Sequence, residues 1–89
     1  MISVIIRNKN QDKALYFLLK NLTERYSNDI GEIIVLDNLS TDKSEEVTNQ
    51  FGAIFHTIKD FSYGGSANFA AQQTKFPIVV MFSAHSYPV

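Results

Sequence analysis

The stretch Ile33-Ile34-Val35-Leu36-Asp37-Asn38 sets the pattern for the rest of the chain. Its first four residues are apolar and mostly β-branched, and they end abruptly at two polar side chains. A short run of this kind is typical of a strand whose two faces are both buried. Further on, any of Ser40, Thr41 or Asp42 can accept hydrogen bonds from the first N–H groups of a helix. The stretch therefore predicts a buried strand that is followed closely by a helix.

The same alternation of strand and helix extends in both directions. Short apolar runs predict three further strands, at residues 2–6, 53–58 and 78–82. Helical spacing of apolar or small residues predicts three helices, at residues 12–26, after residue 42 and at 66–75. Strands that alternate with helices are joined by right-handed crossovers into a parallel sheet. We therefore predict an α/β fold with an open, mostly parallel sheet of four strands and three helices on both faces.

Local signals refine the helix boundaries. In the first helix, a stripe at helical spacing should be buried, made of Leu15, Leu18, Leu19, Leu22 and Tyr26. Asn10 or Asp12 is expected to cap that helix. Gly52 lies where the second helix should end in a left-handed residue. Residues 61–65 contain two glycines and should form a loop before the third helix.

Composition narrows the class of protein. The chain has 89 residues, of which 45% are hydrophobic, a formal net charge of -1 and no cysteine. This length allows one domain, and the near-neutral charge argues against a nucleic-acid partner. The lack of cysteine excludes disulfides and thiolate zinc sites. We see no export signal and no apolar run near the ~18–20 residues of a membrane span, so we expect a cytoplasmic protein, with peripheral contact at the inner membrane face left open.

Polar residues at the ends of the predicted strands are the candidates for function. Open parallel sheets bind ligands beyond the carboxyl ends of their strands, near the point where strand order reverses. The candidates are Arg7, Asn8, Asn10, Asp37, Asn38, Ser83 and His85. Structural roles stay open for several of them, because Asp37 can begin a turn, the asparagines can serve as turn or cap residues, and His85 can be a loop histidine. No Gly-x-Gly-x-x-Gly follows the first strand, which excludes the usual dinucleotide site.

Four segments in order resemble the family 2 inverting glycosyltransferases. Residues 2–10 are similar to the family's opening strand and turn. Residues 32–42 end in Asp37-Asn38-Leu39-Ser40-Thr41-Asp42, which is similar to an acidic pair followed by Gly-Ser-Thr-Asp. Residues 63–68 look like the family's Gly-x-Ala-x-Asn segment, and residues 82–88 stand at the place of its Leu-Asp-Ala-Asp-x-x-Pro segment. The resemblance covers essentially the whole chain.

The resemblance implies a Rossmann-like nucleotide-diphospho-sugar transferase fold, of which residues 1–89 form one partial domain. It implies a nucleotide-binding site made of Arg7, Asn8, Asn10, Asp37, Asn38 and Ser83. The implied function is the nucleotide-sugar-binding portion of a glycosyltransferase, with a nucleoside-diphosphate sugar and a saccharide or lipid-linked acceptor as partners. In this family the base that deprotonates the acceptor lies beyond residue 89, so no catalytic residue is assigned.

The chain departs from the family pattern at three places. Asn38 replaces the second acid of the pair, and Leu39 replaces a glycine, so this turn must avoid positive φ or accept strain. Ser83-Ala84-His85 replaces Asp-Ala-Asp, the segment that positions a divalent cation in the family. Mg²⁺ prefers oxygen ligands, so this change weighs against Mg²⁺ or Mn²⁺ at the conventional site. His85 is then the one candidate metal ligand.

Two other functions fit parts of the sequence. A non-catalytic nucleotide-binding or interaction module on the same scaffold fits the altered metal segment and the small size. A receiver-like signalling domain fits less well, because paired acids should follow the first strand, where Arg7-Asn8-Lys9-Asn10 stands. The outer edge of the fourth strand should also be exposed, which predicts a homo-oligomer formed through that sheet edge.

Overall fold

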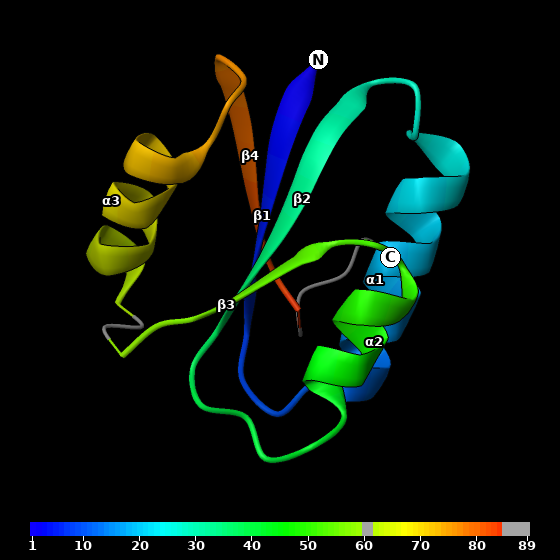
Figure 1. The fold of residues 1–89 in the computed structure, drawn as a ribbon, viewed down its shortest axis with the longest axis vertical. Coiled ribbons are helices and arrows are strands. Elements are labelled where there is room, and N and C mark those ends of the chain that lie inside the picture. Colours follow the sequence, from blue (N-terminus) through cyan, green and yellow to red (C-terminus); the bar gives the residue numbers. More distant parts are fainter. Residues whose placement is uncertain (60–61, 85–89) are drawn as a thin grey trace.

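The computed structural model describes residues 1–59 and 62–84, which form one parallel sheet flanked by helices (Figure 1). In chain order the elements are β1 (Ile2–Asn8), α1 (Asp12–Arg25), β2 (Ile30–Asp37), α2 (Ser44–Gln50), β3 (Ile54–Thr57), α3 (Tyr63–Gln73) and β4 (Ile78–Ser83). Helices α1 and α2 cover one face of the sheet, and α3 covers the other. The predicted α/β architecture is therefore confirmed. Among the described residues, no helix is both long and apolar enough to cross a membrane.

The strand order distinguishes this fold from a receiver-like domain. The sheet has the order β3-β2-β1-β4, and all its strand pairs are parallel. Receiver-like sheets have the order 2-1-3-4-5, whereas the order 3-2-1-4 belongs to the Rossmann type of doubly wound sheet. The receiver-like interpretation is therefore wrong. Strand order reverses beside β1, which lies between β2 and β4.

The central strand β1 supplies the core on both faces of the sheet. Val4 and Ile6 pack with buried leucines of α1, and Ile5 packs on the opposite face with Ile34 and with Ala70 of α3. Since both faces are covered, β1 reads as a nearly continuous apolar run rather than an alternating one. This burial explains why short apolar runs were a reliable signal for the strands.

The leucine stripe of α1 is confirmed, except at its last member. Leu15, Leu18, Leu19 and Leu22 are all buried. Tyr26 is exposed; it is the C-cap residue of α1, and its backbone N–H donates to Leu22 O. The predicted caps are wrong as well, since Gln11 occupies the N-cap position without a side-chain hydrogen bond.

Helix α3 begins earlier than the sequence predicts. The expected loop at residues 61–65 is wrong for its last three positions, because α3 starts at Tyr63. Ser62 caps the helix by accepting a hydrogen bond from the backbone N–H of Gly65 at 3.0 Å. A good cap outweighs the low helix propensity of two glycines at the first turn. The helix ends at Gln73, two residues before the predicted end.

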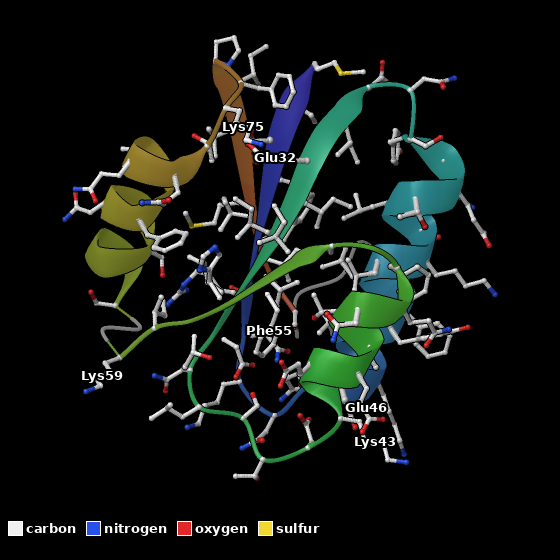
Figure 2. All side chains as sticks on the ribbon, in the orientation of Figure 1. Glu32, Lys43, Glu46, Phe55, Lys59 and Lys75 are labelled. Atoms are coloured by element: carbon white, nitrogen blue, oxygen red, sulfur yellow. The ribbon has the colours of Figure 1, made fainter. Side chains whose placement is uncertain are left out.

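A hydrogen-bonded junction fixes the connection between α3 and β4. The Glu32 carboxylate accepts hydrogen bonds at 2.6 Å from the Ser3 hydroxyl and at 2.6 Å from the Lys75 backbone N–H (Figure 2). The Phe76 N–H donates to the same Ser3 hydroxyl at 3.3 Å. Burial raises the pKa of Glu32, but the bonds from Lys75 and Ser3 and the charge of Lys75 together hold that pKa below its ordinary value.

The turn after β2 contains a strained residue. Leu39 has a φ of 53°, so this turn accepts strain rather than avoiding positive φ. Two hydrogen bonds hold it there: Asn38 N–H donates to Asn8 O at 3.0 Å, and Ser40 N–H donates to the Asp37 carboxylate at 2.8 Å. The left-handed region costs a leucine roughly 1–2 kcal/mol. By contrast, Gly52 has a φ of 70° at no such cost, which confirms the predicted end of α2.

Replacing Leu39 by glycine should stabilise the protein. We expect Leu39→Gly to raise the free energy of unfolding by about 1 kcal/mol, because strain is removed and the exposed side chain contributes little burial. Urea unfolding followed by circular dichroism measures this. Leu39→Ala is the matched control and should give no comparable gain, since it keeps the β-carbon. A Leu39→Gly variant less stable than the wild type would contradict this account.

The junction at Glu32 should make stability depend on pH. The pKa of Glu32 is lowered in the folded state, so its contribution is complete above the ordinary glutamate pKa and is lost as pH falls through the folded pKa. The free energy of unfolding of Glu32→Gln should therefore fall less than that of the wild type on acidification. Urea unfolding at a series of acidic pH values tests this, with Glu24→Gln on exposed α1 surface as the control. Parallel curves for wild type and Glu32→Gln would refute it.

Candidate functional site

The strand register brings most of the predicted site residues to one edge of the sheet. Asn8 of β1 pairs with Asp37 of β2, and Arg7 of β1 pairs with Ser83 of β4. These are the carboxyl ends of the three strands around the point where strand order reverses. Ligands of open parallel sheets bind at this position. The strand register therefore gathers these residues at the expected edge of the sheet.

A buried carboxylate holds the centre of this edge together. Asp37 and Asn8 are only 2% and 1% exposed. The Asp37 Oδ1 atom accepts hydrogen bonds from Asn8 Nδ2 at 2.7 Å and from the Ser40 hydroxyl at 2.6 Å, while its Oδ2 accepts from Ser40 N–H at 2.8 Å. Both carboxylate oxygens are therefore occupied within the protein. Asp37 begins a turn in this structure, and its contact with a nucleoside stays a prediction.

The other end of the Asn8 amide is unsatisfied. Its Oδ1 atom is buried and has no hydrogen-bond partner. Such a group costs about 1–3 kcal/mol relative to a paired one. Swapping the two ends of the amide would not help, because Asp37 needs a donor and receives it from Nδ2. The Asn8 side chain is thus held by Asp37 in spite of an energetic cost.

Asn10 joins the two loops that leave β1 and β2. Its backbone N–H donates to the Ser40 hydroxyl at 2.8 Å, and its Oδ1 accepts from Thr41 N–H at 2.8 Å. Asn10 has a φ of 49°, a conformation that asparagine tolerates better than most residues. The prediction that Asn10 caps α1 is therefore wrong. Its side chain instead binds the loop after β2 to the loop after β1.

Asn38 connects the same turn to the segment after β3. Its Nδ2 donates to Ile58 O at 3.0 Å, and its own backbone oxygen accepts from Lys9 Nζ at 2.9 Å. The side chain is half-buried, so its amide is fixed but reaches the surface of the edge. Of the two residues that stand at the family's acidic pair, Asn38 is thus more accessible than Asp37.

Arg7 lies on the opposite face of the sheet from Asn8 and Asp37. Its Nε donates to the hydroxyl of Ser66 in α3 at 3.0 Å, and Ser66 is fully buried. This bond anchors the first turns of α3 next to the strand ends. Sequence reasoning missed both serines that organise the edge, Ser40 and Ser66. A serine gives little signal in sequence, because its role depends on which distant side chain it meets.

Of the three candidates Ser40, Thr41 and Asp42, it is Asp42 that accepts a hydrogen bond from the first backbone N–H of α2. Its Oδ1 accepts from Ser44 N–H at 3.0 Å, and its Oδ2 accepts from the Asp12 backbone N–H at 3.0 Å. One carboxylate thus stabilises the N-terminal ends of two helices. Burial raises the pKa of Asp42. The hydrogen bonds from Ser44 and Asp12 lower it by more than burial raises it, so this pKa lies below its ordinary value.

The described residues do not form a divalent-cation site at the end of β4. Ser83 offers one hydroxyl, Ala84 is buried and offers no side-chain ligand, and His85 lies outside the described residues. Over residues 1–59 and 62–84, no cluster of three or more His, Cys, Asp or Glu side chains could hold a metal ion. The register also pairs Ser83 with a cationic residue, Arg7, rather than with an acid. This donor set does not fit Mg²⁺ or Mn²⁺.

Comparison with solved structures shows the same fold in larger proteins. A glucosyl-3-phosphoglycerate synthase from Mycobacterium tuberculosis, in complex with Mn²⁺, UDP and glucosyl-3-phosphoglycerate, has a TM-score of 0.75 at 23% identity. The match covers 94% of this chain and 33% of that one. A complex of the synthase with Mn²⁺, UDP-glucose and phosphoglyceric acid has a TM-score of 0.80 at 22% identity, again covering 94% and 33%. A structure described as that of a mycobacterial protein has a TM-score of 0.79 at 20% identity, and the match covers 94% of this chain and 31% of that one.

The chain thus spans about a third of the length of these structures. No curated protein matches it in sequence. The model of the family described as Glycosyl transferase family 2 matches residues 3–88. Because this match spans nearly the whole chain, the chain belongs to glycosyl transferase family 2.

Proposed function

We propose that the chain binds a nucleoside-diphosphate sugar at the carboxyl edge of its sheet, as the donor-binding portion of a glycosyltransferase. The observation that carries this proposal is that the strand register brings Arg7 and Ser83 to the point of strand reversal, next to the turn that Asp37 fixes and that presents Asn38. Family membership supports it. The similar structures, which contain UDP or UDP-glucose, suggest uridine diphosphate as the first ligand to test.

Asn38 is the residue that we assign to binding the nucleobase of the donor. Its Nδ2 is engaged by Ile58 O, which orients the amide and directs its Oδ1 to act as the acceptor. A uracil base offers an imino N–H to such an acceptor. A neutral amide replaces a carboxylate in this role, so the hydrogen bond is retained and a negative charge is absent.

The diphosphate needs positive charge, and the edge supplies it from the ends of two strands. Arg7 lies at the end of β1, and Lys9 follows it. The exposed Lys59 follows β3 (Figure 2). A guanidinium can bind phosphate oxygens in a bidentate manner, and its bond to Ser66 holds Arg7 at the edge. We assign Arg7 to the diphosphate, with the lysines adding to the local potential.

The reaction of the whole enzyme would be transfer of the sugar to an acceptor hydroxyl. A bond forms between the acceptor oxygen and the anomeric carbon, the bond from that carbon to the diphosphate breaks, and a base takes the hydroxyl proton. We assign no residue of this chain as that base. That the acceptor is a saccharide or is lipid-linked stays a prediction. So does the cytoplasmic location, with or without peripheral contact at the inner membrane face.

A second candidate function is a non-catalytic nucleotide-binding or interaction module. The observation in its favour is that Ser83 and His85 stand where the family resemblance places metal-binding acids. Both candidates predict binding of the nucleotide. Sugar transfer from UDP-glucose to an acceptor, measured on a longer protein that contains this domain, separates them.

Substitution of Asn38 should weaken binding of UDP. We expect Asn38→Ala to reduce UDP affinity in titration calorimetry by about fivefold, the effect of one hydrogen bond of roughly 1 kcal/mol. Asn38→Asp keeps an acceptor and should bind better than Asn38→Ala. Asn49→Ala, an exposed asparagine in α2, is the matched control and should match the wild type. Equal UDP affinity for Asn38→Ala and wild type would remove Asn38 from the site.

Binding of UDP should depend little on Mn²⁺. Because Ser83 and Ala84 offer one neutral oxygen and no carboxylate, we expect UDP affinity to change by less than about threefold between Mn²⁺ and a chelator. Calorimetric titrations of the same sample under both conditions measure this. A large gain of affinity in Mn²⁺ would show that the cation is held by residues outside those described.

A further inference from the structure

Two non-glycine residues of the described chain have a left-handed backbone, and both lie at the carboxyl edge of the sheet. Asn10 has a φ of 49° in the loop after β1, and Leu39 has a φ of 53° in the turn after β2. Strained residues of this kind gather at binding and catalytic sites, where the surrounding contacts hold them in place. Asparagine tolerates this conformation, whereas leucine is strained by it, so Leu39 is the residue that needs an explanation.

The turn accounts for the backbone of Leu39 but not for its side chain. Hydrogen bonds from the N–H groups of Asn38 and Ser40, one on each side of Leu39, close the turn whatever residue stands between them. Glycine would adopt the same φ without strain. Burial does not compensate, because the Leu39 side chain is 57% exposed in the described chain. A leucine at this position therefore lowers stability and gains little from contacts among the described residues.

Asn38, the residue before Leu39 in the turn, presents one end of its amide to a ligand. Its Nδ2 donates to Ile58 O at 3.0 Å and to Lys59 O at 3.4 Å. These bonds leave Oδ1 as the end of the amide that accepts from a ligand. A nucleobase that donates to this oxygen through the edge of its ring brings its apolar ring face and its ribose to the neighbouring position. Leu39 stands at that position.

We propose that Leu39 packs against the nucleoside of the donor and holds it on Asn38. This inference rests on the proposed function and deepens it, because it names a second residue that selects the nucleoside. Asn38 recognises the edge of the base, and Leu39 supplies the apolar contact beside it. Since the turn is already fixed by hydrogen bonds, Leu39 loses little conformational freedom on binding. The strain in the free protein thus accompanies a site that is organised before the ligand arrives.

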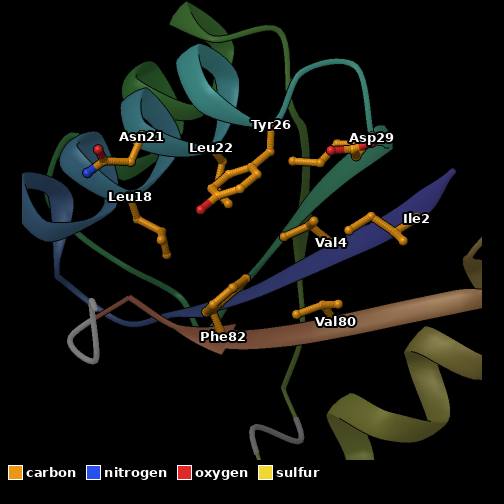
Figure 3. Close-up of a pocket in the computed structure, with 10 residues that line it drawn as sticks. Ile2, Val4, Leu18, Asn21, Leu22, Tyr26, Asp29, Val80 and Phe82 are labelled. Carbon is orange, nitrogen blue, oxygen red and sulfur yellow. The ribbon is translucent and has the colours of Figure 1, made fainter. Parts of the chain in front are cut away.

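The apolar groove drawn in Figure 3 does not suit this ligand. It has a volume of about 320 Å³, and its lining includes Leu18, Leu22, Val80 and Phe82. None of the described residues that line it is a lysine or an arginine, and its lining includes the Asp29 carboxylate, so it offers no positive charge to a phosphate. By contrast, Lys9 Nζ donates to the backbone oxygen of Asn38 at 2.9 Å, within the turn itself.

Calorimetric titration with UMP and UDP tests the contact, with substitutions that separate backbone strain from side-chain contact. Leu39→Asn replaces the apolar side chain by one that tolerates the left-handed backbone. It should unfold at no lower urea concentration than the wild type, yet bind both nucleotides about fivefold more weakly. Leu39→Met keeps an apolar side chain and should bind within about twofold of the wild type. Phe17→Ala is the matched control, since Phe17 is 58% exposed on α1, and it should bind like the wild type.

The heat capacity change of binding gives a readout that a purely structural role would not move. Burial of apolar surface makes this change negative, so it should be less negative for Leu39→Asn than for the wild type. Equal fold losses for UMP and UDP are expected, because the two ligands share the nucleoside.

The outcomes separate this inference from the proposed function. If the wild type binds UDP and Leu39→Asn matches it in affinity and heat capacity change, the contact of Leu39 is overturned and the proposed function stands. A loss of affinity for UDP but not for UMP would also overturn the contact, because Leu39 would then act on the diphosphate. A wild type that binds neither nucleotide would overturn both.

Discussion

The burial of one carboxylate, that of Asp37, is the constraint on which the site depends. A charged group at 2% exposure must have its oxygens occupied by donors, and Asn8 and Ser40 provide them. The bonds to Ser40 form the tight turn in which Leu39 takes a φ of 53°. The bond from Asn8 leaves that amide with a buried unsatisfied oxygen. Both costs are tolerated because the alternative is an unpaired charge at the centre of the sheet edge.

The fold could be predicted because its signals are local and repeated. The apolar run at residues 33–36 and the leucines of α1 report burial directly, and their alternation along the chain leaves few topologies open. The predicted helix boundaries were wrong where the end of a helix depends on tertiary contacts or on a single capping residue. Ser62 starts α3 ahead of two glycines, and Tyr26 falls just past the end of α1. Neither result follows from the spacing of apolar residues.

The candidate site was predictable in position but not in detail. Parallel strands bring Arg7, Asp37 and Ser83 to one edge whatever their side chains do. Which way a side chain turns is decided by partners that are distant in sequence, as when Asp37 turns inward to Asn8 and Arg7 is held by Ser66. The comparisons establish the family and the fold, while the proposed ligand rests on the chemistry of the edge. A neutral amide at residue 38 and the Ser-Ala pair at the end of β4 give this edge less negative charge than the resemblance implies.

The most direct test of the central claim is a two-dimensional ¹H–¹⁵N spectrum of the labelled chain titrated with UDP. Binding at the carboxyl edge predicts progressive shifts of the amide signals of Arg7, Asn38 and Ser83. Signals at the opposite end of the sheet, such as that of Asp29, should stay in place. An absence of shifts at a large excess of UDP, or shifts confined to the groove lined by Leu18, Leu22 and Val80, would contradict the account.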